Sequence, residues 1–428
     1  MTPAGEPLRA LAGVGRTPIS GAAVACANCH GADAKGGREA SVAPPSITWD
    51  ELAKPYGHVH GSRRHGPFDE RSFRRAVNEG LDPAGHALDW AMPRYALSTT
   101  EAAALVAYLK RVALERDPGI GERSLRIGGM FPALMARAVG AYFERINRAG
   151  GIHQRRLELA VDELPVFAAL TVLETGAQFD GAPIIRAYAA ESEGGRLVFN
   201  VQAGPLEEAA ALVDYALRRA GEGALRAAVV SAHGSGAAQR ALERCKSRGC
   251  GDVLQTDWRH GDALKAQRRE HVFFFGPARE FASFLDELQR SSDASWRPSV
   301  YAPGALARAA FAAQTRFAGR LFLAFPSAPP GRAWEPLRRE LGLAAEHEAA
   351  QLAALAAASV LAEGLRRAGR DLSRERLVRA LETLSDFDPE GFAPRVSYGP
   401  GRRVGARGSY VLALGAQGEA ALAWVALD

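Results

Sequence analysis

The sequence predicts a chain of at least two domains, a small all-α domain followed by a larger α/β domain with two lobes. Its 428 residues are 47% hydrophobic and 24% charged, which is typical of globular proteins with two or three domains. After the turn-rich segment Asp117–Gly121, strand and helix patterns alternate to the end of the chain, as in domains with parallel sheets. Before that segment there is no such alternation. We therefore expect one domain over residues 1–117 and another over 118–428.

The N-terminal domain contains the sequence Cys26-Ala27-Asn28-Cys29-His30. Two thiols separated by two residues and followed at once by histidine are the pattern of covalent haem attachment. Zinc would need two further ligands close by, and the only other two cysteines lie in the second domain. A redox dithiol would need a long helix after the motif, where glycines follow instead. The motif predicts one covalently bound haem c, attached through Cys26 and Cys29, with His30 as an iron ligand.

Met92 is the candidate for the second axial ligand of this haem. Pro93 biases the methionine toward an extended conformation, so its thioether lies in a loop. Ser98-Thr99-Thr100-Glu101 then forms a capping box at the start of a helix expected over 99–114. Imidazole and thioether together suit an electron-transfer iron and leave no open coordination position. Bis-histidine ligation is the alternative, and the competing residues are His58, His60, His65 and His86.

The attachment motif, the methionine loop and the closing helix resemble a class I c-type cytochrome domain over about residues 15–117. In such cytochromes a proline carbonyl accepts a hydrogen bond from the haem histidine, which orients the ring and raises its basicity. The resemblance makes Pro44 and Pro45 candidates for that role. An ordinary loop turn explains the two prolines equally well.

The second domain is expected to begin with a βαβ unit. A strand at 124–129 precedes a helix that starts at Pro132 and ends at Ala149-Gly150-Gly151, and the next strand spans 157–162. Further strands are expected near 166–173, 183–187, 197–201, 226–231, 271–275, 298–301 and 320–325. Helices are expected at 205–219, 235–247, 277–289 and 348–368.

The start and end of this domain resemble periplasmic solute receptors of the Leu/Ile/Val-binding type. Leu125–Gly128 and Glu144–Ile152 match their opening, and Glu363–Asp371 matches their late helix. Residues Phe392, Val396, Ser397, Tyr398 and Gly405 fit their terminal hairpin. The resemblance implies two lobes that close on a small ligand by hinge motion. The Gly/Ser-rich loop that holds the ligand carboxylate in this family is replaced here by Glu174–Asp180, so binding of an α-amino acid is not implied.

Contacts in the cleft between the lobes should come from strand ends. The candidates are Phe131, Glu174, Tyr188, Ser231, His233 and Tyr301, and a purely structural role is the alternative for each. No nucleophile and acid are paired with His233, so no catalytic site is predicted.

Cys245 and Cys250 flank a turn at Gly249 that brings their backbones within disulfide range. An oxidising periplasm favours a disulfide between them. Two buried free thiols are the alternative.

Composition excludes several classes of function. The 53 basic and 48 acidic residues give a net charge of +5. The basic residues do not form a stripe along the sequence, so nucleic-acid binding is not expected. The apolar run near Gln351–Leu361 is too short to span a bilayer and is expected to be a buried helix, so no transmembrane segment is predicted. No export signal is visible, although covalent haem attachment in bacteria takes place outside the cytoplasm. We therefore expect a periplasmic protein that has lost upstream sequence.

The two resemblances together imply an electron carrier rather than an enzyme. Its haem would exchange electrons with a dehydrogenase, another cytochrome or an oxidase, while the receptor-like domain would dock a partner or sense a small solute. The alternative is the solute-binding component of an ABC-type importer for amino-acid-like solutes, with an accessory haem domain. A redox sensor gated by ligand binding would need both activities, because coupling between two sites is reciprocal.

Overall fold

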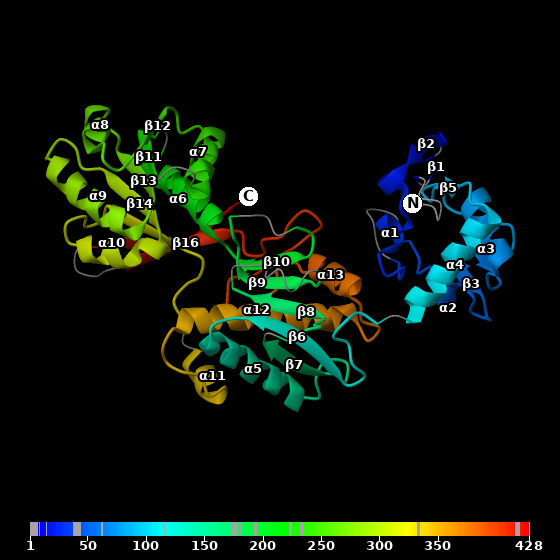
Figure 1. Cartoon of the computed structure of the whole chain (residues 1–428). Coiled ribbons are helices and arrows are strands. Elements are labelled where there is room, and N and C mark those ends of the chain that lie inside the picture. The colour runs from blue at the N-terminus through cyan, green and yellow to red at the C-terminus, as the bar shows by residue number, and fades with distance from the viewer. Residues whose placement is uncertain are drawn as a thin grey trace. The chain divides into compact units, whose positions relative to one another are not determined.

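The computed structural model describes two compact units, Met1–Asp117 and Pro118–Asp428, which are considered separately below (Figure 1). Outside the described residues are 1–6, 8, 14, 37–43, 61–62, 115, 162, 173–178, 180, 192–194, 222–224, 232–234, 332–333, 416–419 and 428. The candidate cleft residues Glu174 and His233 fall among these. The division between the units lies at the turn-rich segment where the sequence pattern changes.

The first unit consists mainly of helices, with two small antiparallel sheets. Its helices are η1 (Gly21–Val24), α1 (Cys26–His30), α2 (Trp49–Leu52), α3 (Glu70–Glu79) and α4 (Thr99–Leu114). One sheet has the order β2-β1-β5 and the other is the hairpin β3-β4. The bounds are β1 (Arg9–Ala12), β2 (Thr17–Ser20), β3 (His58–His60), β4 (Arg63–His65) and β5 (Arg94–Tyr95).

Local sequence explains where the two longer helices of this unit begin and end. Asp69 caps α3 by accepting a hydrogen bond from the backbone of Ser72, and the left-handed Gly80 ends that helix. The predicted capping box of α4 is present, because Ser98 and Glu101 each bond the other's backbone N–H. The two helices bury Phe73, Val77, Val106 and Leu109 in one small apolar core.

The first lobe of the second unit has a parallel sheet in the order β10-β9-β8-β6-β7. Its strands are β6 (Ser124–Met130), β7 (Arg156–Val161), β8 (Ala168–Thr171), β9 (Ile184–Tyr188) and β10 (Val198–Gln202). Helices α5 (Ala133–Arg148) and α12 (Glu348–Ala368) lie together along this sheet, with α11 (Trp334–Glu340) and α13 (Arg374–Glu382) in the same lobe (Figure 1). Strands buried on both faces are expected to be continuous apolar runs, which is why most of them could be found in the sequence.

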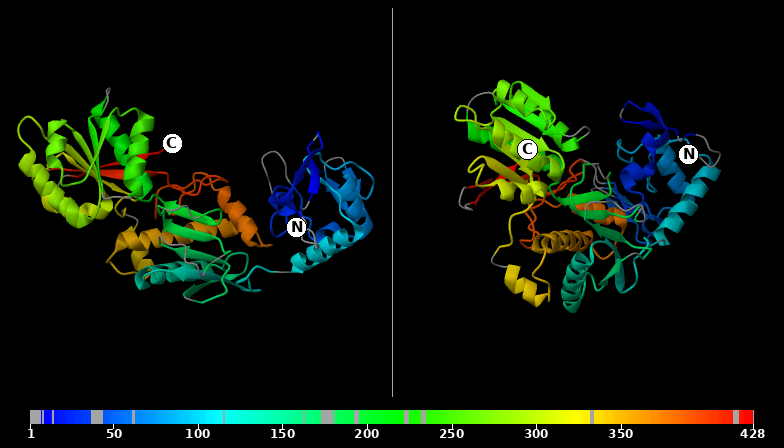
Figure 2. Two further views of the ribbon diagram at one scale, coloured as in Figure 1. Left: turned by 45° about the horizontal axis from the view of Figure 1, so that its top comes forward. Right: turned by 60° about the vertical axis from the view of Figure 1, so that its left-hand side comes forward.

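The second lobe contains a sheet in the order β12-β11-β13-β14-β15-β16-β17. Its strands are β11 (Ala227–Ser231), β12 (Val253–Thr256), β13 (His271–Phe275), β14 (Ser299–Pro303), β15 (Leu321–Phe325), β16 (Gly408–Leu414) and β17 (Ala420–Ala426). Its helices are α6 (Pro205–Ala220), α7 (Gly236–Arg248), α8 (Gly261–Ala266), α9 (Ala278–Ser291), η3 (Gly304–Leu306) and α10 (Ala307–Ala313). Helices cover both faces of the sheet (Figure 2).

The terminal hairpin of the chain is β16 with β17, the two antiparallel strands at the edge of the second sheet. The expectation that residues 392–405 form this hairpin was wrong. That segment belongs to the first lobe, where Gly405 donates a backbone hydrogen bond to Asn200 of β10 and Tyr398 packs on Phe199. The chain then passes from this segment into β16 of the second lobe.

Helix α12 is the buried helix expected at 348–368, and as a whole it is long and apolar enough to cross a membrane by length and composition. Within the described part of the chain it is the one helix that meets this test. The most apolar 18-residue stretch of this helix is 78% buried, and the side chains of the helix belong to the same core as those of α5 and β9. The burial supports its role as the central helix of the first lobe.

Candidate functional site

Helix α1 presents the two cysteines of the haem-attachment motif on one turn. Cys26 and Cys29 lie three residues apart, so their side chains project from the same side of the helix. Both are half-buried, and neither forms a disulfide with another described cysteine. Burial raises the pKa of Cys26, with a smaller opposing effect from the Tyr95 hydroxyl, which lies 4.0 Å from its Sγ. Tyr95 is itself held in place, because its hydroxyl donates to the carbonyl of Val24 at 2.8 Å.

His30 ends α1 and is oriented by a backbone carbonyl. Its Nδ1 lies 2.9 Å from the carbonyl oxygen of Pro45, so Nδ1 carries the proton and Nε2 has a lone pair. Burial lowers the pKa of His30, and the hydrogen bond to Pro45 partly opposes this effect. The imidazole is therefore neutral at pH 7, which is the form that binds a metal.

Gly36 allows the Pro45 segment to approach the histidine. Its φ of 82° is in the left-handed region. A Cβ at this position would lie 2.6 Å from the carbonyl carbon of Pro45 and 2.7 Å from the carbonyl oxygen of Pro44. Only glycine fits here without displacing the two prolines.

Met92 lies in a loop that is held by one arginine. The guanidinium of Arg94 donates to the carbonyls of Leu88 at 3.0 Å and Asp89 at 3.1 Å, and also to the carbonyl of Met92. The Met92 side chain is half-buried and packs against the same apolar core as Cys26. The thioether and the attachment cysteine are thus directed to one region of the first unit.

The four competing histidines have other surroundings. His58 contacts the Leu52 carbonyl through Nε2 at 3.3 Å and stacks on His65. His65 contacts the Gly66 carbonyl, and His86 contacts the carboxylate of Asp82 at 3.2 Å. The side chain of His60 is outside the described part. The rings of His58 and His65 also lie edge-on to Phe68, which packs against the same small core as Cys26 and Met92, so these two histidines stay the alternatives to Met92.

The residues of this region fit a c-type haem. Two thiols, one neutral imidazole with a lone pair on Nε2, and one thioether are the donor set that such a haem requires. Cys26 and Met92 pack against an apolar core that includes Val24, Leu52, Phe73 and Tyr95, and such surroundings exclude water from a porphyrin. Among the described residues, no three or more His, Cys, Asp and Glu side chains come together as a metal site.

In the second unit, three of the predicted cleft residues lie at the carboxyl ends of strands. Phe131 directly follows β6, Tyr188 is the last residue of β9, and Ser231 is the last residue of β11. All three are half-buried. Burial raises the pKa of Tyr188 to about 12, with a smaller contribution from the charge of Glu208.

The assignment of Tyr301 to the cleft was wrong. This side chain is 0% exposed, and it stacks between Phe273 and Phe322 in the core of the second lobe. Its hydroxyl lies 3.0 Å from Nδ1 of His271, which is the first residue of β13. Tyr301 therefore points toward the amino ends of the parallel strands, away from the ends where a ligand would bind.

Sequence reasoning missed two polar residues at strand ends in the first lobe. Thr171 ends β8 and Gln202 ends β10, where Gln202 pairs in register with Tyr188. The side chains are 0% and 1% exposed, and no hydrogen-bond partner for the Thr171 hydroxyl or for either amide atom of Gln202 lies among the described residues. Polar residues at the last position of apolar strands were the available signal.

Glu208, in the first turns of α6, is a third residue of this kind. Burial raises its pKa to about 8, although the backbone N–H of Gly304 donates a hydrogen bond to the carboxylate. An acid with this pKa is mainly protonated at pH 7 and can donate a hydrogen bond.

The expected disulfide between Cys245 and Cys250 is not formed, and both residues are buried free thiols. The left-handed Gly249 ends α7 and brings the N–H of Cys250 to 3.0 Å from the carbonyl of Cys245. The two thiols share a hydrogen bond, which raises the pKa of Cys245 and lowers that of Cys250. The hydrogen bond and the apolar core around it satisfy the pair without a covalent link.

Comparison with known proteins agrees with this description of the two units. Residues 21–113 match the family model named Cytochrome c. The N-terminal part of the chain is therefore a cytochrome c domain. A search of curated protein sequences found no match.

Solved structures resemble the remainder of the chain. A fatty acid ABC transporter substrate-binding protein from Thermomonospora curvata is 14% identical, with a TM-score of 0.56 over 73% of this chain and 95% of its own. A putative branched-chain amino acid ABC transporter from Rhodospirillum rubrum is 14% identical, with a TM-score of 0.56 over 70% and 100%. A leucine binding protein from Thermotoga maritima is 14% identical, with a TM-score of 0.52 over 71% and 99%. The second unit thus has the two-lobed α/β fold of periplasmic binding proteins.

Proposed function

We propose that this protein is a periplasmic electron carrier that transfers single electrons through one haem c, held by Cys26, Cys29, His30 and Met92. The receptor-like unit docks a redox partner or senses a small solute. The hydrogen bond between His30 Nδ1 and the Pro45 carbonyl carries this proposal, because it prepares a neutral imidazole for an iron. The matching cytochrome c model over residues 21–113 supports it.

Each residue would have a separate role in this function. The haem, when bound, supplies an iron that accepts and releases one electron. Cys26 and Cys29 would hold it on α1, and Pro45 fixes the orientation of His30. Met92 would bind the iron together with His30, so no small molecule would bind there and react. The redox partner would be a dehydrogenase, another cytochrome or an oxidase.

The proposal is tested by producing the protein with a bacterial export signal and haem-maturation factors. The denatured polypeptide should stain for haem, and the reduced protein should have a low-spin spectrum. The double variant Cys26→Ser/Cys29→Ser should lose the stain. A colourless, correctly exported protein would disprove the proposal.

A second function, a solute-binding component of an importer, is favoured by the fold of the second unit. The polar strand ends of the first lobe offer hydrogen bonds to a ligand. Such a receptor should be stabilised against heat by its solute, whereas a pure electron carrier should not. A sensor should show this stabilisation together with a shift of reduction potential on ligand addition.

A further inference from the structure

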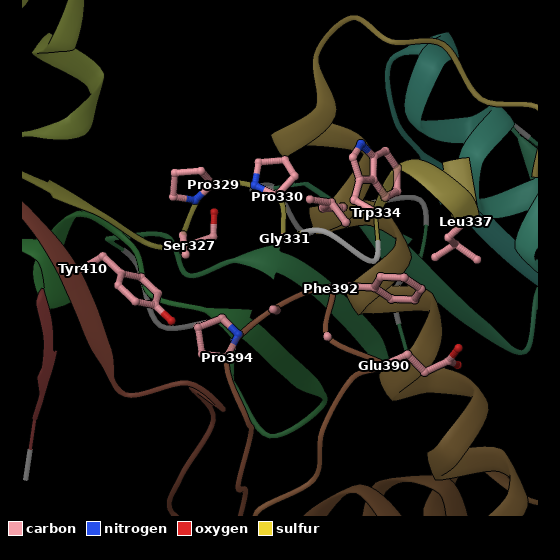
Figure 3. Close-up of a pocket in the computed structure, with 14 residues that line it drawn as sticks. Ser327, Pro329, Pro330, Gly331, Trp334, Leu337, Glu390, Phe392, Pro394 and Tyr410 are labelled. Atoms are coloured by element: carbon pink, nitrogen blue, oxygen red, sulfur yellow. The ribbon is translucent and has the colours of Figure 1, made fainter. Parts of the chain in front are cut away.

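The second unit contains a pocket of about 190 Å³ that none of the sequence-predicted cleft residues lines. It lies where the chain leaves β15 of the second lobe and enters α11 of the first (Figure 3). One wall is the connecting segment Ser327–Gly331. The opposite wall is the loop Glu390–Pro394, and Tyr410 of β16 lies at one end.

Rigid aromatic and proline side chains form a large part of the lining of this pocket. Three of the side chains are aromatic, namely Trp334, Phe392 and Tyr410, and three are the prolines at positions 329, 330 and 394. Trp334 is 6% exposed and Phe392 is 4% exposed, so both are fixed by the core of the first lobe. Because proline has a fixed φ, these walls need little rearrangement to accept a ligand.

A few polar groups accompany the apolar walls. Ser327 and Tyr410 contribute hydroxyls. The indole N–H of Trp334 is buried, and no hydrogen-bond partner for it lies among the residues that the structure describes. Because that N–H is buried, a ligand would rely on the hydroxyls of Ser327 and Tyr410 for its hydrogen bonds.

The charge of Glu390 is already balanced. Its carboxylate accepts hydrogen bonds from the buried Tyr142 hydroxyl and from the Arg145 guanidinium, both on α5. The pocket therefore offers no uncompensated charge to a ligand. The Glu390 carboxylate would repel an anion. A cation would gain little from the same carboxylate, because Arg145 already balances its charge.

The size of the pocket limits the ligand to one small ring. An apolar cavity of about 150 Å³ holds one benzene molecule, so about 190 Å³ leaves room for one small substituent. Flat rings stack well on aromatic walls, and an aromatic ring adds to the burial of apolar surface.

We propose that this pocket binds an uncharged, single-ring aromatic solute with a hydroxyl group, a phenol in chemical class. The ring packs between the prolines and the aromatic side chains, and the hydroxyl bonds with the polar groups of the lining. This site is separate from the strand-end residues of the proposed cleft, and it does not depend on the proposed electron transfer.

The test uses the full-length protein loaded with haem and phenol itself as the probe. Phenol should raise the unfolding temperature of the second unit in a concentration-dependent manner, and calorimetry should show saturable binding. Benzoate and tetramethylammonium ions should give at least tenfold weaker binding. Equal or tighter binding of either ion would overturn the proposal.

Two variants locate the binding site. Ala328→Phe fills the pocket and should abolish phenol binding, whereas Ala312→Phe on the exposed side of α10 should leave it unchanged. Tyr410→Phe removes one hydroxyl and should weaken binding about 3- to 10-fold, the worth of one hydrogen bond. Unchanged affinity in a folded Ala328→Phe protein would place phenol elsewhere and refute the proposal. If that variant does not fold, a different pair of results would refute the proposal. These are that Tyr410→Phe binds phenol as tightly as the parent does, and that the parent binds benzoate as tightly as phenol.

Discussion

The carbonyl oxygen of Pro45 lies 2.9 Å from Nδ1 of His30, fifteen residues earlier in the chain. A carbonyl can only accept a hydrogen bond, so this contact fixes the tautomer of the imidazole as well as its orientation. Gly36 lies against the same segment, where a Cβ would collide with the backbone of both prolines. Three short stretches of the first unit thus prepare a single ring nitrogen for a metal.

Replacement of Gly36 with alanine should disturb this arrangement. The new Cβ would lie 2.6 Å from Pro45, so the Pro44–Ser46 backbone must move away from His30. A weaker hydrogen bond makes the imidazole a poorer donor to iron, which destabilises the oxidised form, and the reduction potential should rise. Potentiometric titration of the haem band measures this change.

Gly85→Ala is the matched control for this prediction. Its φ of 88° is equally left-handed, but a Cβ there would meet nothing within 4 Å. The control should lose some stability from backbone strain and keep the parent potential. If both variants kept the parent potential, the hydrogen bond to Pro45 would have no part in setting it.

Replacement of Met92 with alanine should remove the sixth ligand of the iron. We expect the long-wavelength absorption that arises from sulfur-to-iron charge transfer to disappear, and the iron to become high-spin or water-ligated. Absorption spectra of the oxidised protein measure both effects. Met130→Leu, in the second unit, should leave the spectrum as it is. An unaltered spectrum in Met92→Ala would assign the sixth position to a histidine.

The candidate haem site is readable in the sequence because its chemistry is local. Five consecutive residues hold both thiols and the imidazole, and one proline marks the methionine loop. The Pro45 contact was harder, because either of two adjacent prolines fitted the resemblance and only the folded chain shows which carbonyl faces His30. Apolar strands of the second unit were also readable, since buried parallel strands are continuous hydrophobic runs.

The cleft residues could not be predicted as well, because they depend on register. The sequence pattern indicated that Tyr301 ends its strand, but β14 continues to Pro303. Tyr301 therefore lies within the strand, and its ring is buried in the core. Thr171 and Gln202 come together with Tyr188 only through the pairing of β8, β9 and β10. No local pattern contains that pairing.

Cys245 and Cys250 should behave as protected free thiols. Both are 0% exposed, so a thiol reagent should label neither in the native protein and both after denaturation. Mass spectrometry of the peptide that contains them, without prior reduction, makes the measurement. A mass lower by two hydrogens and resistance to labelling would instead show a disulfide, and the predicted free pair would be wrong.

The ionisation of Glu208 should make the second unit less stable as the pH rises. Its pKa in the folded protein is about 8 because the carboxyl group is buried, compared with an ordinary value of 4.5. Between these two values the folded state keeps a proton that the unfolded state has released. The stabilisation is fully present below the lower value and is lost as the pH rises through the upper one. The loss has an upper limit of about 1.4 kcal/mol for each pH unit.

Glu208→Gln separates this effect from other titrations, since glutamine keeps the size and hydrogen bonding of the protonated acid but cannot ionise. The free energy of unfolding, measured in urea, should be higher for the variant relative to the parent at about pH 9 than at about pH 5. The change in this difference between the two pH values should be up to a few kcal/mol. The exposed Glu340→Gln serves as the control and should show no such trend. A constant difference between Glu208→Gln and the parent across this range would mean that Glu208 is ionised in the folded protein at neutral pH. In that case a positively charged group would have to balance it, and the strand-end residues near Tyr188 would present a charged surface rather than a neutral one.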